Sequence, residues 1–249
     1  MDVTPVSVRF LGSGDAFGSG GRFQACIHVR AGDSSVLLDC GASSLIAMRS
    51  FGVEPSDIGA ILISHLHGDH FGGIPFFILD GQFLSKRERP LLIAGPPGIK
   101  ERVRQAQEAL FAGSSQTEQK YEIRFLEWQD RQRAAIGGIA ATPFEVVHAS
   151  GAPPFALRLE VHGRTIAYSG DTEWTNALVE AAEGVDLFIC EANFYDKKIK
   201  FHLDYQTLAA RRGELRCKRL VLTHMNREML ARLPSLDVEA AADGTEIAL

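Results

Sequence analysis

The chain has 249 residues, 45% of them hydrophobic and 23% charged, with a formal net charge of −5. This length and composition predict a single globular domain over residues 1–249 with a core of its own. The net acidity argues against a general attraction to nucleic acid or to an anionic membrane, and no apolar run approaches the roughly 20 residues that span a bilayer. The N-terminus lacks the basic start and apolar stretch of a signal peptide, and the four cysteines form no CxxC pair, so we expect a cytoplasmic protein with reduced thiols.

Hydrophobic periodicity and turn residues predict an alternation of strands and helices. Strands are expected at 6–11, at 25–41 (two strands around a Gly-Asp-Ser-Ser turn), and at 58–64, 90–95, 138–148, 155–161, 164–170, 185–192 and 219–225. Helices are expected at 73–84, 98–113, 175–184 and 205–215. This order predicts an α/β protein with helices outside its sheet layers.

The segment Ser64–Gly73 reads SHLHGDHFGG and holds three of the chain's eight histidines. It follows a buried strand, and the glycine at position 68 is expected to allow a sharp turn in a short loop. Imidazole suits zinc, and a carboxylate adds a hard anionic ligand that favours two metals in one site. A single zinc ion needs three protein ligands plus water, so four candidates here predict two metals and further ligands elsewhere. A plain polar surface loop would not concentrate histidine in this way. The four candidates are His65, His67, Asp69 and His70.

The remaining ligands are expected at other strand ends, because those ends meet at one edge of a sheet. His148 ends FEVVH, Asp171 follows IAYSG, and His224 follows LVLT. Each of these residues alone is weak evidence for a metal ligand, since a histidine after a strand is more often a capping or core residue. Together with the cluster, the three form a strong metal-binding constellation. His28, within a strand, and His162, in a hairpin turn, are assigned no metal.

The motifs FLGSGDAFGSGG, LLDCG, SHLHGDHFGG, GPPGI, VVH, YSGDT and LTH occur in an order that resembles the metallo-β-lactamase superfamily, in its RNase Z-like and phosphodiesterase-like branch. The resemblance spans almost the whole chain. It implies an αββα four-layer sandwich with metals at one edge between the sheets.

The resemblance also implies a ligand assignment for two divalent metal ions. Zinc is expected, although manganese or iron would suit the same ligands. The first metal would be held by His65, His67 and His148, and the second by Asp69, His70 and His224. Asp171 would bridge both.

Two adjacent cations would lower the pKa of a bridging water and stabilise charge on a phosphoryl or carbonyl oxygen. Asp69 would also orient the resulting hydroxide. His202 is the best remaining candidate for the general acid, against the alternative of an ordinary surface histidine. In RNase Z-like proteins a Ser or Thr follows this histidine, whereas Leu203 follows here. Glu191 would either orient His202 or have a structural role.

The substrate is less constrained by the residues. RNase Z proteins carry a long tRNA-gripping arm between the positions of His148 and Asp171, but here residues 149–170 are accounted for by two strands and a turn. We therefore expect a phosphodiesterase acting on a small or cyclic phosphodiester, and a nucleic-acid substrate is disfavoured. The alternatives are an acyl hydrolase of the glyoxalase type, an arm-less RNase Z-like nuclease, and a non-catalytic metal-bearing scaffold. The sequence leaves undecided whether the protein forms a homodimer.

Overall fold

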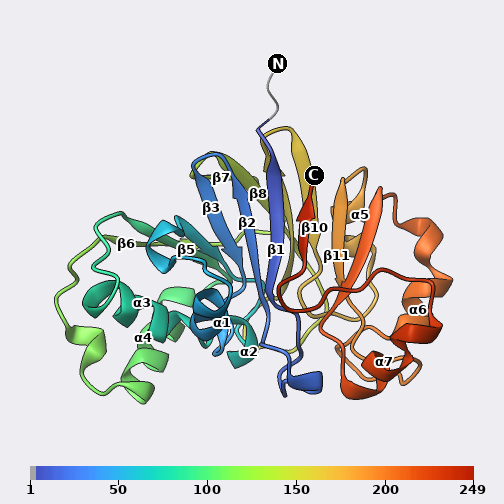
Figure 1. Cartoon of the computed structure of the whole chain (residues 1–249), viewed down its shortest axis with the longest axis horizontal. Helices are drawn as coiled ribbons and strands as arrows, with labels where there is room; N and C mark the ends of the chain where they lie inside the picture. The colour runs from blue at the N-terminus through green and yellow to red at the C-terminus, as the bar shows by residue number, and fades with distance from the viewer. Residues whose placement is uncertain (1–3) are drawn as a thin grey trace.

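The computed structural model describes residues 4–249, which form two β-sheets packed face to face with helices on both outer surfaces (Figure 1). The predicted α/β four-layer sandwich is confirmed by this arrangement. Within the described residues, no helix is long and apolar enough to cross a membrane.

The first sheet has the strand order β13-β1-β2-β3-β4-β5-β6. Neighbours from β3 to β6 are parallel, and the other pairs are antiparallel. The strands are β1 (Val6–Gly12), β2 (Cys26–Ala31), β3 (Ser34–Leu38), β4 (Ala60–Leu62), β5 (Leu91–Gly95), β6 (Ile123–Glu127) and β13 (Glu246–Ala248).

The second sheet has the order β12-β11-β10-β9-β8-β7. Its strands β10 to β12 are parallel, and β7 to β10 are antiparallel neighbours. The strands are β7 (Ala134–Ile136), β8 (Ile139–Glu145), β9 (Phe155–Val161), β10 (Arg164–Tyr168), β11 (Leu187–Glu191) and β12 (Arg219–Thr223).

Helices α1, α3 and α4 cover the outer face of the first sheet, and α5, α6 and α7 cover the second (Figure 1). The α-helices are α1 (Ser44–Ser50), α2 (Gly68–Phe71), α3 (Ile74–Phe83), α4 (Ile99–Leu110), α5 (Asn176–Ala182), α6 (Tyr205–Ala210) and α7 (Arg227–Arg232). Short 3₁₀ helices are η1 (Ser19–Gly21), η2 (Pro55–Asp57), η3 (Ser114–Gln116), η4 (Arg212–Glu214) and η5 (Leu233–Ser235).

The packing follows from the apolar pattern of each element. In α4, Ile99, Val103 and Gln107 recur every four residues and are the buried positions, so one stripe faces the sheet. The parallel strands β4 and β11 are buried along their whole length, as expected of strands covered on both faces. Side chains such as Phe10 fill the layer between the sheets.

The parallel strands also determine where polar residues gather. Strands β3 and β4 of one sheet and β10, β11 and β12 of the other end at a common edge, where α2 lies between the sheets (Figure 1). Carboxyl ends of parallel strands leave polar loops at one rim of a sheet, which is the usual place for a ligand site in open α/β folds.

Candidate metal centre

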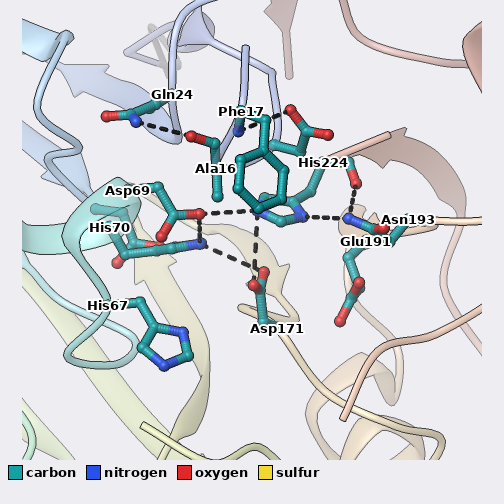
Figure 2. Close-up of polar contacts among 12 residues, drawn as sticks. Ala16, Phe17, Gln24, His67, Asp69, His70, Asp171, Glu191, Asn193 and His224 are labelled. Carbon is teal, nitrogen blue, oxygen red and sulfur yellow. Dashed lines mark hydrogen bonds and ion pairs between the residues drawn. The ribbon is translucent and has the colours of Figure 1, made fainter. Parts of the chain in front are cut away.

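The residues of SHLHGDHFGG lie at the end of β4, but not all of them lie in a loop. Asp69 and His70 belong to the one-turn helix α2, which Gly68 opens. The chain bends at Leu66 and His67 just before this helix, but the conformation does not require glycine at position 68, because its φ is not positive and a Cβ there would meet nothing within 4 Å. The helical turn directs the side chains of Asp69 and His70 to the sheet edge, where Figure 2 shows them facing Asp171.

The structure brings the seven candidate ligands together in two groups. In each group, one ligand atom per residue lies within 4.8 Å of every other. The first group is His65, His67 and His148, and the second is Asp69, His70, Asp171 and His224.

Asp171 reaches both groups from the end of β10. Its Oδ2 lies 3.8 Å from Nε2 of His65, and its Oδ1 lies 3.4 Å from Nε2 of His70. Three of these buried atoms, His65 Nε2, His70 Nε2 and Asp171 Oδ1, have no hydrogen-bond partner among residues 4–249. Buried polar atoms without a partner are costly, so their convergence on one point fits a bound cation.

The histidine rings are oriented by partners outside the cluster. Nδ1 of His70 donates to the Asp39 carboxylate at 2.7 Å, and Nδ1 of His148 donates to the carbonyl of Phe201 at 2.7 Å. This leaves Nε2 of each ring turned towards the centre, as a metal-binding histidine requires. In the first group, Nε2 of His148 and Nδ1 of His67 lie 3.0 Å apart.

Asp39 belongs to the candidate site through its hydrogen bond to His70, and the sequence analysis did not predict it. It follows the apolar strand β3 directly, so the rule that selected Asp171 would have selected it. Its side chain is fully buried and accepts from Ser64, His70 and Tyr168. Its backbone φ of 60° lies in the left-handed region, which aspartate tolerates better than most residues.

The electrostatics of the site favour a cation. Burial opposes ionisation of Asp171, but the charges of His224 and His70 outweigh it and hold the pKa of Asp171 well below its usual value. Burial lowers the pKa of His70, but the nearby carboxylates outweigh it and raise that pKa well above its usual range. Burial lowers the pKa of His65, which keeps that ring neutral, the form that binds metal. Ionised carboxylates and imidazole nitrogens are the donor set of a divalent-metal site, and a bound cation would displace the proton that the carboxylates favour on His70.

His202 and Glu191 form a pair beside the two groups. Nδ1 of His202 lies 3.1 Å from Oε2 of Glu191, and the other oxygen of Glu191 accepts from the backbone N–H of Thr172 at 2.5 Å. Burial lowers the pKa of His202, but the hydrogen bond to Glu191 and the charges of Glu191 and Asp171 raise it to about 9. Leu203 is buried and Asp204 caps α6, which accounts for the residues that follow His202.

Both the cluster and the pair open into a cavity of about 560 Å³, whose lining includes Phe17, His67, Asp69, His202 and Arg227. A larger cavity of about 760 Å³ lies along α4 and β6, and none of the candidate site residues line it. The His and Asp side chains in its lining, rather than its size, make the first cavity the candidate functional one.

The two histidines that the sequence assigned to no metal lie away from the cluster. Nε2 of His28 pairs with the Ser35 hydroxyl at 2.9 Å, on β2 and β3. His162 lies in the turn between β9 and β10.

Residues 6–237 match the model of the family described as anti-Pycsar protein Apyc1. The chain is 30% identical to a ribonuclease Z of Methanothermobacter thermautotrophicus, over 89% of this chain and 87% of that protein. The short form of human tRNase Z is similar in structure, with a TM-score of 0.79 and 25% identity over 97% of this chain and 98% of that one. The Bacillus subtilis metallo-β-lactamase-fold protein YhfI has a TM-score of 0.78 and 23% identity over 98% of this chain and 100% of that one.

These matches span both sheets and every candidate ligand. The chain therefore belongs to the anti-Pycsar protein Apyc1 family, within the RNase Z-like branch of the metallo-β-lactamase superfamily of metal-dependent hydrolases.

Proposed function

We propose that the protein is a dinuclear metal-dependent phosphodiesterase acting on a small or cyclic phosphodiester. The observation that carries this proposal is the pair of ligand groups that share Asp171, with the His202–Glu191 pair at the same cavity. The proposed ligands are His65, His67 and His148 for one cation, Asp69, His70 and His224 for the other, and Asp171 for both. Zinc suits these ligands, and manganese or iron would be accepted by them.

Bound divalent cations would lower the pKa of a water nucleophile and polarise a phosphoryl oxygen. The chain itself would supply the remaining steps. Asp69, with Oδ2 lying 3.3 Å from Nε2 of His224, would orient the attacking oxygen. Glu191 holds Nδ1 of His202, so Nε2 is the nitrogen that would deliver a proton to the leaving oxygen.

The size of the site supports a small substrate. A cavity of about 560 Å³ lies within the range of small-molecule sites. Residues 149–170 form β9, β10 and short connections, with no protruding arm among them. Arg227 lines the cavity beside the acidic Glu228 and Asp15, and its guanidinium would pair with a phosphate better than with an acyl group. Nζ of Lys197 lies 5.3 Å from the ring centroid of Phe194, another lining residue.

A nuclease acting on RNA is the second candidate, because a relative named ribonuclease Z matches 89% of the chain. The acidic net charge and the missing arm favour a small phosphodiester over RNA as the substrate.

The test is hydrolysis of bis-p-nitrophenyl phosphate by zinc- and manganese-loaded protein, with a p-nitrophenyl acyl ester and a precursor tRNA run in parallel. We expect chelator-sensitive cleavage of the phosphodiester above the other two. In His202→Asn we expect turnover to fall about 10²- to 10⁴-fold, the usual contribution of a general acid, with metal content unchanged. His162→Asn, which changes a turn histidine outside the cavity, is the matched control. Preferential cleavage of the acyl ester would refute the proposal.

A further inference from the structure

Phe17 is an aromatic side chain that the fold leaves uncovered at the mouth of the candidate site. Its side chain is 93% exposed, the highest value among the exposed large hydrophobic residues within residues 4–249. It lies in the glycine-rich connection between β1 and β2 and lines the same cavity as Asp69 and His202. In the view of Figure 2 its ring overlaps His224, which lines the same cavity.

The connection that carries Phe17 is held by hydrogen bonds from the side chains of Asp15 and Gln24. The Asp15 carboxylate accepts from the backbone N–H groups of Phe17 and Ser19, at 3.2 and 2.9 Å, and from the Ser19 hydroxyl at 2.7 Å. The side-chain amide of Gln24 donates to the carbonyl of Ala16 at 3.1 Å. Gly18 follows with a φ of 66°, which lets the chain turn back directly after the ring. The backbone therefore presents Phe17 to the cavity in a defined position.

The rest of the cavity supplies what an aromatic substituent would need. Phe194 and Ile199 line it as apolar groups, and its polar lining includes candidate ligands, Arg227, Glu228 and Asp15. A substrate whose phosphate sits at the metal ligands would place its organic part towards the mouth, where Phe17 stands. Covering a phenyl ring removes apolar surface from water, and an aromatic partner adds an offset-stacked or edge-to-face contact.

We propose that Phe17 is a specificity-determining residue that stacks on a flat aromatic group, of the kind a nucleobase provides, attached to the phosphodiester. This inference rests on the proposed function and deepens it. Stacking of a base on an aromatic side chain corresponds to roughly 5- to 150-fold in binding. The site therefore discriminates between substrates by their organic part as well as by their phosphate.

The test compares a nucleoside 3′,5′-cyclic phosphate with the same ribose cyclic phosphate carrying hydrogen in place of the base. In Phe17→Leu, the ratio of kcat/KM between the two substrates falls roughly 5- to 150-fold, mainly through KM. In Phe17→Trp the ratio is retained, and the new indole fluorescence of the metal-loaded protein is quenched by a nucleoside monophosphate and not by ribose phosphate. Phe83→Leu is the matched control, because Phe83 is another exposed phenylalanine and does not line this cavity.

An unchanged ratio in Phe17→Leu, with phosphodiester hydrolysis intact, overturns the role of Phe17 and leaves the proposed function standing. An equal loss of activity on both substrates also overturns it, because the residue would then position the loop. A change in oligomeric state of Phe17→Leu by light scattering would make the ring an interface residue and overturn it too. If the wild-type protein cleaves neither cyclic phosphate nor bis-p-nitrophenyl phosphate, the proposed function itself fails.

Discussion

Replacing Asp39 by asparagine removes the charge of one buried side chain and keeps its size nearly unchanged. The carboxylate accepts the backbone N–H of Ser64 at 2.7 Å on one oxygen. Its other oxygen accepts from the Ser64 hydroxyl at 2.8 Å, from Nδ1 of His70 at 2.7 Å and from the Tyr168 hydroxyl at 2.8 Å. An asparagine keeps the size and tolerates the left-handed backbone, but it has a single acceptor oxygen.

The magnitude follows from the donors left without an acceptor. In the variant, the amide oxygen can keep the hydrogen bond from the Ser64 backbone N–H. The amide nitrogen then faces His70 and Tyr168, which lose their acceptor, and the Ser64 hydroxyl rotates to accept a hydrogen bond from this nitrogen. Two charge-assisted hydrogen bonds of about 1.5–3 kcal/mol each are lost, so the free energy of unfolding should fall by about 3–6 kcal/mol. His70 also loses the partner that holds its proton on Nδ1, and metal affinity should fall about 10- to 100-fold.

Two measurements check this: urea unfolding of the chelator-treated protein, and zinc titration against a competing chelator. Tyr168→Phe is the control, because it removes one hydrogen bond to the same oxygen and leaves the acceptor of His70 in place. We expect it to lower the free energy of unfolding without lowering metal affinity. Equal zinc affinities in Asp39→Asn and Tyr168→Phe would refute the reasoning.

Three further predictions concern the ligands and a buried histidine. Asp171→Asn should remove at least one equivalent of bound metal and abolish hydrolysis, and full activity would contradict the bridging role. Chelation should lower the free energy of unfolding by about 2.7 kcal/mol relative to protein at a free metal concentration of 100 times Kd, whereas an unchanged urea midpoint would contradict a folded-state metal site. Burial, followed by the charges of Arg30 and Arg9, lowers the pKa of His28 to about 4, so the unfolded chain takes up this proton first and stability should fall as pH drops from about 6.5 to 4. In the metal-free wild type, the free energy of unfolding should therefore fall by up to about 3 kcal/mol more than in His28→Gln over this pH range. The same change in the free energy of unfolding between pH 7 and pH 4.5 in both proteins, measured by urea unfolding, would refute this prediction.

The fold was largely predictable because its long elements carry clear patterns. The alternation in β9 and the four-residue stripe in α4 report which face is buried. Short elements such as β7 and β13 were not predicted, because three residues carry no period and their pairing depends on strands distant in sequence.

The candidate site was predictable where it depends on the type of a residue and on its position in the sequence. A histidine or aspartate after an apolar strand is visible in the sequence, and the structure gathers all seven such candidates. Contacts through the backbone are not visible, such as the carbonyl of Phe201 that orients His148. The exposure of Phe17 also could not be predicted, since it depends on how Asp15 folds the connection around it.

The place of β13 has a consequence for the order in which the chain folds. Val8 of β1 pairs with Ile247 of β13, although every strand of the second sheet lies between these two residues in the sequence. During synthesis the outer edge of β1 therefore stays open until residues 246–248 emerge. An open edge can recruit a strand from another chain, and late long-range pairing is slow. Truncation before residue 246 should thus yield a protein that retains all seven candidate metal ligands and aggregates through β1.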